Sequence, residues 1–285
     1  MKRCGEQKHI RYAVFTAAVC LFIGLSGQTT QGAYIDVIDA LGPLGHWRLG
    51  ESSGSIAADR SNGHSGTYSG ATLGAPGVLA GDSDTAVDFD GISDIVTIGP
   101  SADLLLTGNL SVSFWFNADS FPVSVIPEPL FTLTADAAAN GTAKLAELAL
   151  DKNNDIVYTH EYGNQGSSEQ TYTFSTANLS EDTWYNIALI RDSSAKEVSL
   201  YINDSLLDTY SYTTQAEGYT EGTLRMGGYG GPRFDGTIDE FTIFGSILTG
   251  QNVSDIYDAA LVPEPATGLL LVLGAMPLVF RGRRS

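Results

Sequence analysis

The feature that most constrains the fold is a series of short apolar segments separated by turn-forming residues. The segments are rich in Val, Ile, Phe, Tyr and Thr, and Gly, Asn, Asp and Ser lie between them. In residues 110–117, apolar and polar positions alternate, so Leu110, Val112, Phe114 and Phe116 share one face of a strand. The clearest segments are residues 45–49, 86–89, 95–98, 110–116, 184–190, 198–202, 224–227 and 236–244. This pattern predicts an all-β fold, a two-sheet antiparallel jelly-roll sandwich.

Local signals add a hairpin and a single helix. Asn203-Asp204 tolerates the positive φ that a tight turn needs, so residues 201–207 predict a hairpin. Thr249 can cap a short C-terminal helix, whose apolar positions follow helical spacing: Val253, Ile256, Tyr257 and Ala260. Residues 70–81 and 165–170 are expected to form surface loops. No internal repeat and no second domain are apparent.

The N-terminal segment has the order of a secretory signal peptide, which we assign to residues 1–33. Four basic residues (Lys2, Arg3, Lys8 and Arg11) precede an apolar run over residues 12–25, and small and polar residues follow. Cleavage is expected between Gly27 and Ala33. Both cysteines, Cys4 and Cys20, lie in this segment, so the exported chain would contain neither a disulfide nor a cysteine-ligated metal.

The C-terminal segment, residues 262–285, has the composition of a membrane stop. Pro263-Glu264-Pro265 precedes fifteen uncharged residues, 266–280. The last five residues, 281–285, are RGRRS, in which Arg281, Arg283 and Arg284 are basic. As a helix, this run would be about 23 Å long, shorter than the hydrocarbon core of a bilayer. A frayed apolar terminus or a buried core helix is the alternative interpretation.

The region between these segments is strongly acidic. Residues 34–262 contain eight Lys and Arg against thirty-one Asp and Glu. Such a surface repels nucleic acid and anionic lipid, so no nucleic-acid partner is expected. It favours divalent cations and neutral or cationic ligands. Solubility in a salty environment is an equally good explanation of this charge.

Six motifs, in order, resemble the LamG-like domains of the concanavalin A-like lectin/glucanase superfamily. They are HWRLGESSGSIAADRSNGHSGTYSG (46–70), AVDFDGISDIVTI (86–98), LSVSFWFNAD (110–119), TWYNIALIRD (183–192), VSLYINDSLLDT (198–209) and FDGTIDEFTIFGSILTGQNVSDIYDAAL (234–261). The resemblance covers residues 44–261 and implies a jelly-roll sandwich in one domain.

The C-terminal segment resembles the PEP-CTERM sorting signal of Gram-negative bacteria, which combines Pro-Glu-Pro, a hydrophobic helix and an Arg-rich end. The resemblance implies export through the inner membrane and transient anchoring through residues 266–280. It also implies an exosortase-type enzyme as a partner, cleaving near Pro263–Pro265. The destination would be the cell surface or the extracellular polysaccharide matrix.

Because the superfamily includes glucanases, the resemblance makes glycoside hydrolysis a candidate activity. Retaining hydrolysis needs two carboxyl groups about 5–5.5 Å apart. Glucanases of this fold place theirs on one strand as Glu-x-Asp-x-x-Glu, but no Glu in this chain has an Asp two residues later. Asp239 and Glu240 are adjacent, so strand alternation is expected to send them to opposite faces. The sequence therefore favours a protein that is not an enzyme.

Calcium is the cofactor that the family resemblance implies. Many relatives hold a calcium ion where the first Ser/Gly/Asp loop meets the Ile-Asp-Glu strand. By motif position, the candidate ligands are Asp59, Asn62 and Asp239, with Glu51 in reach of the same place. The alternative is that Asp59 and Asn62 form turns and Asp239 caps backbone groups.

Carbohydrate binding is the function that these observations favour, with extracellular polysaccharide as the partner. Sugar sites pair an exposed aromatic ring with polar side chains, and Tyr229, Tyr219 and Tyr162 lie in polar or glycine-rich surroundings. Tyr158 is a further candidate. The alternative is a purely structural surface protein without a specific ligand.

Overall fold

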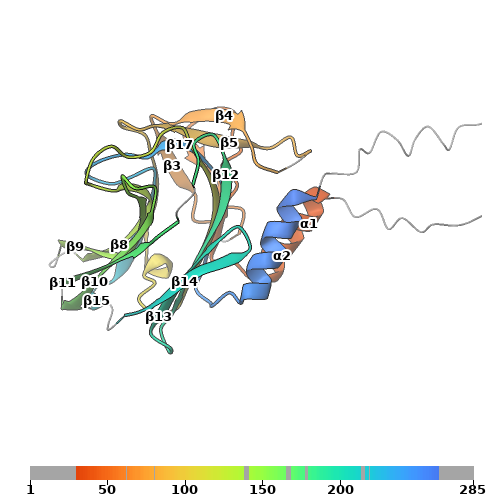
Figure 1. The fold of residues 1–285 in the computed structure, drawn as a ribbon. Helices are drawn as coiled ribbons and strands as arrows, with labels where there is room; N and C mark the ends of the chain where they lie inside the picture. The colour runs from red at the N-terminus through yellow and green to blue at the C-terminus, as the bar shows by residue number, and fades with distance from the viewer. Residues whose placement is uncertain are drawn as a thin grey trace, which may run out of the picture.

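The protein is a sandwich of two antiparallel β-sheets, as the sequence predicts. The computed structural model describes residues 30–262 except 62, 80, 138–140, 165–167, 177–178, 213–215 and 218. Figure 1 shows the two sheets face to face, with two helices against the outer face of one of them. This arrangement is consistent with a jelly roll.

The sheet that carries the helices, sheet A, has eight strands within the described residues, in the order β14-β13-β12-β7-β17-β5-β4, with β1 paired to β17. Its strands are β1 (Gly45–Trp47), β4 (Thr72–Pro76), β5 (Thr85–Asp90), β7 (Leu110–Ala118), β12 (Trp184–Asp192), β13 (Glu197–Ile202), β14 (Ser205–Ser211) and β17 (Asp235–Phe244). All neighbours in sheet A pair antiparallel.

The opposite sheet, sheet B, has nine strands in the described part of the chain, in the order β11-β10-β9-β8-β16-β6-β3-β2, with the short β15 beside β10. Its strands are β2 (Ile56–Ala57), β3 (Gly66–Ser69), β6 (Ile95–Ser101), β8 (Glu128–Ala137), β9 (Gly141–Leu150), β10 (Ile156–Asn164), β11 (Ser168–Phe174), β15 (Ala216–Glu217) and β16 (Glu221–Met226). A 3₁₀ turn, η1 (Ala102–Leu104), follows β6.

The main core lies between the sheets and follows the predicted alternation. Leu110, Val112, Phe114 and Phe116 of β7 all belong to this core. Trp115 points to the other face of sheet A, where it stacks on a helix residue. The predicted hairpin is also confirmed, because Asn203 has φ 59° between β13 and β14.

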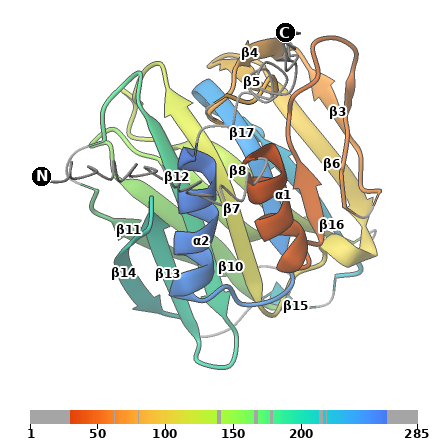
Figure 2. The same ribbon diagram turned by 90° about the vertical axis from the view of Figure 1, so that its right-hand side faces the viewer.

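Two helices cover the outer face of sheet A (Figure 2), although the sequence predicted only one. The predicted one is α2 (Gly250–Leu261), and a capping box between Thr249 and Asn252 fixes its start. The helix that the sequence did not predict, α1 (Thr30–Ala40), buries Tyr34 and Ile38 in the same layer. The prediction of a single helix was therefore wrong.

Most of the two terminal segments lie outside the described residues. Of the predicted signal peptide, the structure describes only residues 30–33, where α1 begins. Of the predicted sorting tail, it describes only Val262. No helix in the described part of the chain is both long and apolar enough to cross a membrane.

Candidate functional site: a polar groove on sheet B

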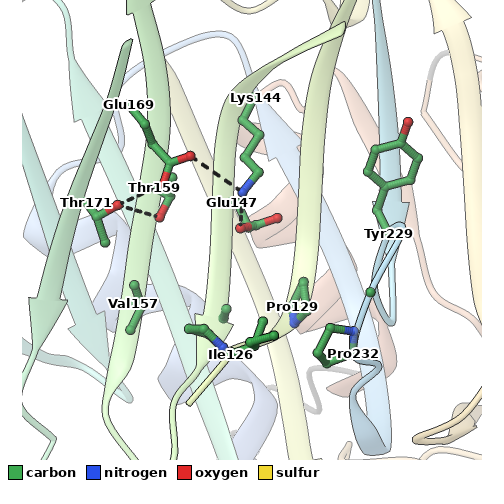
Figure 3. A pocket seen from close by; sticks show the side chains of 13 residues that line it. Ile126, Pro129, Lys144, Glu147, Val157, Thr159, Glu169, Thr171, Tyr229 and Pro232 are labelled. Carbon is green, nitrogen blue, oxygen red and sulfur yellow. Dashed lines mark hydrogen bonds and ion pairs between the residues drawn. The ribbon is translucent and has the colours of Figure 1, made fainter. Parts of the chain in front are cut away.

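The outer face of sheet B carries a groove of about 290 Å³ (Figure 3). Strands β8 to β11 form its floor, and residues 126–127 and 229–232 form its rim. Alternation along β10 explains the floor: Ile156 and Tyr158 point into the core, so Val157 and Thr159 point out into the groove.

A row of polar side chains crosses the floor. The strand register places Thr132, Glu147, Thr159 and Thr171 opposite one another on β8, β9, β10 and β11. The hydroxyl of Thr132 donates to Glu147 Oε2 over 3.1 Å, and the hydroxyls of Thr159 and Thr171 lie 3.2 Å apart. Thr132 and Thr159 are buried, so the carboxylate of Glu147 and the exposed hydroxyl of Thr171 are the groups of this row that can exchange hydrogen bonds with the hydroxyls of a sugar.

Charged groups gather beside this row. Lys144 Nζ donates to Glu147 Oε1 over 2.9 Å and lies 4.0 Å from Glu169 Oε2. Burial alone would lower the pKa of Lys144, but Glu147, Glu169 and Glu161 outweigh it and raise that pKa. Burial raises the pKa of Glu161, and although Lys144 opposes this effect, Glu169 and Glu147 add to it.

Tyr229 supplies an aromatic ring at the other end of the groove. It lies in a glycine-rich turn in which Gly228 and Gly230 adopt positive φ, and its side chain is 40% exposed. The guanidinium of Arg225 lies 4.2 Å from the ring centroid and also donates to the hydroxyl of Thr134 over 3.0 Å. Arg225 therefore ties the ring to the sheet.

The structure separates the predicted sugar-binding tyrosines. Tyr229 lies on the groove as an accessible ring, whereas Tyr219 is only 8% exposed and packs into the core between the sheets. The expectation that Tyr219 and Tyr158 present exposed rings was wrong, because both point inward from sheet B or the segment beside it. Tyr162 belongs to β10, but its side chain lies outside the described residues.

The sequence did not single out the polar groups of the groove: Thr132, Lys144, Glu147, Thr159, Glu169 and Thr171. A partial signal existed in the alternation along residues 131–134 (FTLT) and 171–174 (TYTF), which sends Thr132 and Thr171 to the face opposite the core. The register between four strands, which brings these groups together, cannot be read from any single segment.

Three of the predicted calcium ligands, Asp59, Glu51 and Asp239, accept hydrogen bonds from other groups of the protein. Asp59 accepts from the backbone amides of His46, Ser61 and His64. Glu51 accepts from the amide of Ala58 over 2.8 Å and from the hydroxyl of Tyr68 over 2.5 Å. Asn62 lies outside the described residues. Across the described residues, no group of three or more His, Cys, Asp and Glu side chains is arranged to hold a metal ion.

Asp239 and Glu240 do not point to opposite faces, so that expectation was wrong. Asp239 pairs with Trp115 and Thr242 with Ser113, so β17 carries one extra residue, and Glu240 adopts φ 52°. This β-bulge directs both carboxyls to the face that α1 covers. Burial raises the pKa of Asp239 well above its usual range, and the neighbouring charge of Glu240 adds to the shift.

The bulge belongs to a network of ion pairs under α1. Glu240 contacts His46 Nε2 at 2.6 Å and Arg48 Nε at 2.8 Å, and Arg48 also pairs with Asp82 and Asp84. A second hollow of about 340 Å³ borders this network. Its charged lining residues already have protein partners: Arg48, Asp84, Arg60 with Asp39, and Glu51. Among the described residues no aromatic side chain lines this hollow, whereas Tyr229 lines the groove on sheet B, so the groove is the better candidate for ligand binding.

Solved structures of similar fold include a sialidase and a toxin domain. Trypanosoma rangeli sialidase aligns with a TM-score of 0.57 at 16% identity, over 76% of this chain and 32% of the sialidase. The botulinum neurotoxin serotype D binding domain aligns with a TM-score of 0.55 at 14% identity, over 76% of this chain and 51% of that one. The chain thus spans about a third to a half of these proteins, and the likeness is one of fold.

The sequence itself identifies the family. No curated protein matches the chain. Residues 89–254, more than half of the chain, match the Laminin_G_3 family, which is described as the concanavalin A-like lectin/glucanases superfamily. The matched region runs from β5 to α2 and includes every strand that forms the floor of the groove. The chain belongs to the concanavalin A-like lectin/glucanase superfamily.

Proposed function

We propose that this protein is an exported, non-catalytic lectin-like protein that binds extracellular polysaccharide in the groove on sheet B. The observation that carries the proposal is the pairing of an exposed Tyr229 ring with a floor of fixed polar groups in one groove. Apolar C–H faces of a sugar ring can stack on the tyrosine while its hydroxyls bond to the floor. Family membership supports the proposal at the level of fold.

A glycan array tests the proposal directly. The full chain, purified in a detergent without a sugar headgroup, is compared with Tyr229→Ala and Tyr229→Phe. We expect Tyr229→Ala to weaken binding about tenfold or more, because it removes the stacking surface. Tyr229→Phe keeps the ring and should bind nearly as well as the native chain.

A matched surface change controls for nonspecific effects. Leu206 is also exposed but lies on β14 of sheet A, so Leu206→Ala should leave glycan binding unchanged. If the native chain binds no glycan on the array, the purely structural role is the better description. Equal binding by Tyr229→Ala and the native chain would place any sugar site outside this groove.

Calcium remains part of the proposal as a structural ion near Asp59, Asp239, Glu51 and Asn62. The same array with and without EDTA, together with thermal unfolding, tests this part. Loss of binding or of thermal stability on chelation, restored by added calcium, would support the ion. Unchanged behaviour in both measurements would remove calcium from the proposal.

The absence of catalysis is also proposed. We expect no release of reducing sugar from any glycan that the protein binds. If reducing sugar is released, its rate is measured in variants. Asp239→Ala and Glu240→Ala test whether the carboxyls at the β-bulge take part, and Glu147→Gln tests whether the groove takes part. Release that one of these changes abolishes would establish an enzyme in place of a binding protein.

A further inference from the structure

The polar end of the groove contains more carboxylates than cations. Glu161 and Glu169 lie directly opposite each other on β10 and β11, and Glu147 lies on the neighbouring strand β9. All three interact with one ammonium group, that of Lys144. Even with Arg225 included, the described side chains here have one more negative than positive charge.

This arrangement is unfavourable for the protein alone. Like charges directly opposite each other on neighbouring strands are destabilising. Lys144 donates to Glu147 over 2.9 Å and lies farther, 4.0 Å, from Glu169. Arg225 is held over the ring of Tyr229 and bonded to Thr134. Lys144 therefore shares its charge among three carboxylates, and the described cations neutralise the Glu161–Glu169 pair only in part.

Charge and geometry together narrow the class of ligand. An acidic sugar would bring a further negative charge to Glu147 and Glu169 in the groove, which opposes binding. A metal ion needs several carboxylates around one point, and the described residues contain no such group of three. An ammonium group needs only one or two carboxylate partners, which it can contact by charge-assisted hydrogen bonds.

Building on the proposed polysaccharide function, we propose that the groove is selective for glycans that contain amino sugars with free ammonium groups. A sugar ring stacks on Tyr229, and an ammonium group binds at the carboxylate end beside Glu169 and Glu161. Both ends line or border the same groove, in which Figure 3 shows Tyr229 and Glu169 on opposite sides. The carboxylates thus set the specificity, and the tyrosine supplies contact area.

The test compares oligosaccharides that differ only in charge. Calorimetry with the full chain uses partly deacetylated chitosan oligomers, their fully N-acetylated equivalents and oligogalacturonate of equal length, at a pH where the amine is protonated. We expect the free amine to bind about tenfold tighter than the acetylated form, and the acidic oligomer to bind weakest. Glu161→Gln with Glu169→Gln should remove the preference for the amine, so that the amine and the acetylated oligomer bind this variant with similar affinity.

Controls separate this specificity from general attraction to an acidic protein. Glu197→Gln removes an exposed carboxylate from β13 of sheet A and should leave the preference unchanged. Poly-lysine of matched charge should not displace the chitosan oligomer. If poly-lysine competes equally, or if a metal ion blocks the amine, the amino-sugar specificity is overturned.

Other outcomes distinguish this inference from the function on which it rests. Equal affinity for the amine and the acetylated oligomer would overturn the charge specificity and leave polysaccharide binding in place. Failure of the amine to bind, while another glycan binds in a Tyr229-dependent way, would have the same meaning. If no glycan binds at all, the proposed function itself fails, and the specificity fails with it.

Discussion

Asp84 is the residue of the Arg48 network whose protonation is best placed to affect stability. Burial raises its pKa to about 6, and the charge of Glu240 adds to the shift although Arg48 opposes it. Arg48 must balance three carboxylates, those of Asp82, Asp84 and Glu240. The proton on Asp84 therefore relieves a local excess of negative charge.

A pH dependence follows from this shift. Between about pH 4 and pH 6, folded Asp84 keeps its proton while unfolded Asp84 loses it, so the folded state binds more protons. The free energy of unfolding should therefore fall as the pH rises through this window. Asp84→Asn cannot titrate and should show a shallower fall in urea unfolding over the same range. An identical slope for both proteins would contradict this assignment.

Arg225 is a positioning residue for Tyr229. Its guanidinium lies 4.2 Å from the ring centroid, while its other contact fixes it to Thr134 on β8. We expect Arg225→Ala to weaken glycan binding several-fold without changing the melting temperature appreciably, because the ring loses its support and must be ordered by the ligand. Arg225→Lys keeps the charge and should restore part of the affinity. If both variants bind like the native chain, the turn alone orders the ring.

At the scale of elements, α1 is an integral part of the folded domain. Ile38 is fully buried in the layer between the helices and sheet A, and Tyr34 packs against His46. We expect Ile38→Ala to lower the free energy of unfolding by roughly 2–4 kcal/mol and Ile38→Val by only about 1 kcal/mol. Denaturant unfolding measures both. Loss of less than about 0.5 kcal/mol in Ile38→Ala would show that α1 detaches from the sheet.

The same packing places a limit on where the proposed signal peptide could be cleaved. Tyr34 is buried, so cleavage after it would remove a core residue. We expect N-terminal sequencing of the exported protein to find its first residue at or before Tyr34, in agreement with the predicted window between Gly27 and Ala33. A mature chain that starts later than Tyr34 would contradict the role of α1 in the domain.

The elements that were predicted correctly are those whose structure depends on residues close together in the sequence. The alternation in β7, the Asn203-Asp204 turn and the Thr249 cap each depend on neighbouring residues, and the structure confirms all three. Residues 70–81 were expected to form a surface loop, but they include β4. It forms a strand at the edge of sheet A, where only one side needs a partner.

The candidate site was predictable only in part. Tyr229 could be selected because its flanking glycines leave the ring accessible. The shared face of Asp239 and Glu240 depends on an extra residue relative to β7, which no pattern in β17 reveals. Lys144 and Glu147 share a face of β9 only because the pairing of β9 with β8 is irregular between them, and Glu169 comes from β11.

At the scale of the whole molecule, the helices and the groove lie on opposite outer faces. The helices cover sheet A, and the groove opens on sheet B. Figures 1 and 2 show that the start of α1 and the end of α2 lie side by side at the same end of the helical layer. The two proposed membrane-directed segments therefore join the domain at one place, away from the groove. A precursor anchored through the tail would leave the groove free to bind polysaccharide.

The proposed sorting tail gives a prediction for the complete protein. In a host with an exosortase-type enzyme, the full chain should first appear in the inner-membrane fraction and then as a shorter form at the surface or in the matrix. Mass spectrometry of that form should place its new C-terminus near Pro263–Pro265.

A chain that ends at Val262 keeps the described core and the groove, so it should bind the same glycans but appear in the soluble fraction. Replacing Arg281, Arg283 and Arg284 with Ala removes the basic end and should reduce retention of the precursor in the membrane. An extracellular product that still carries residues 266–285 would refute the sorting role and leave a simple anchor.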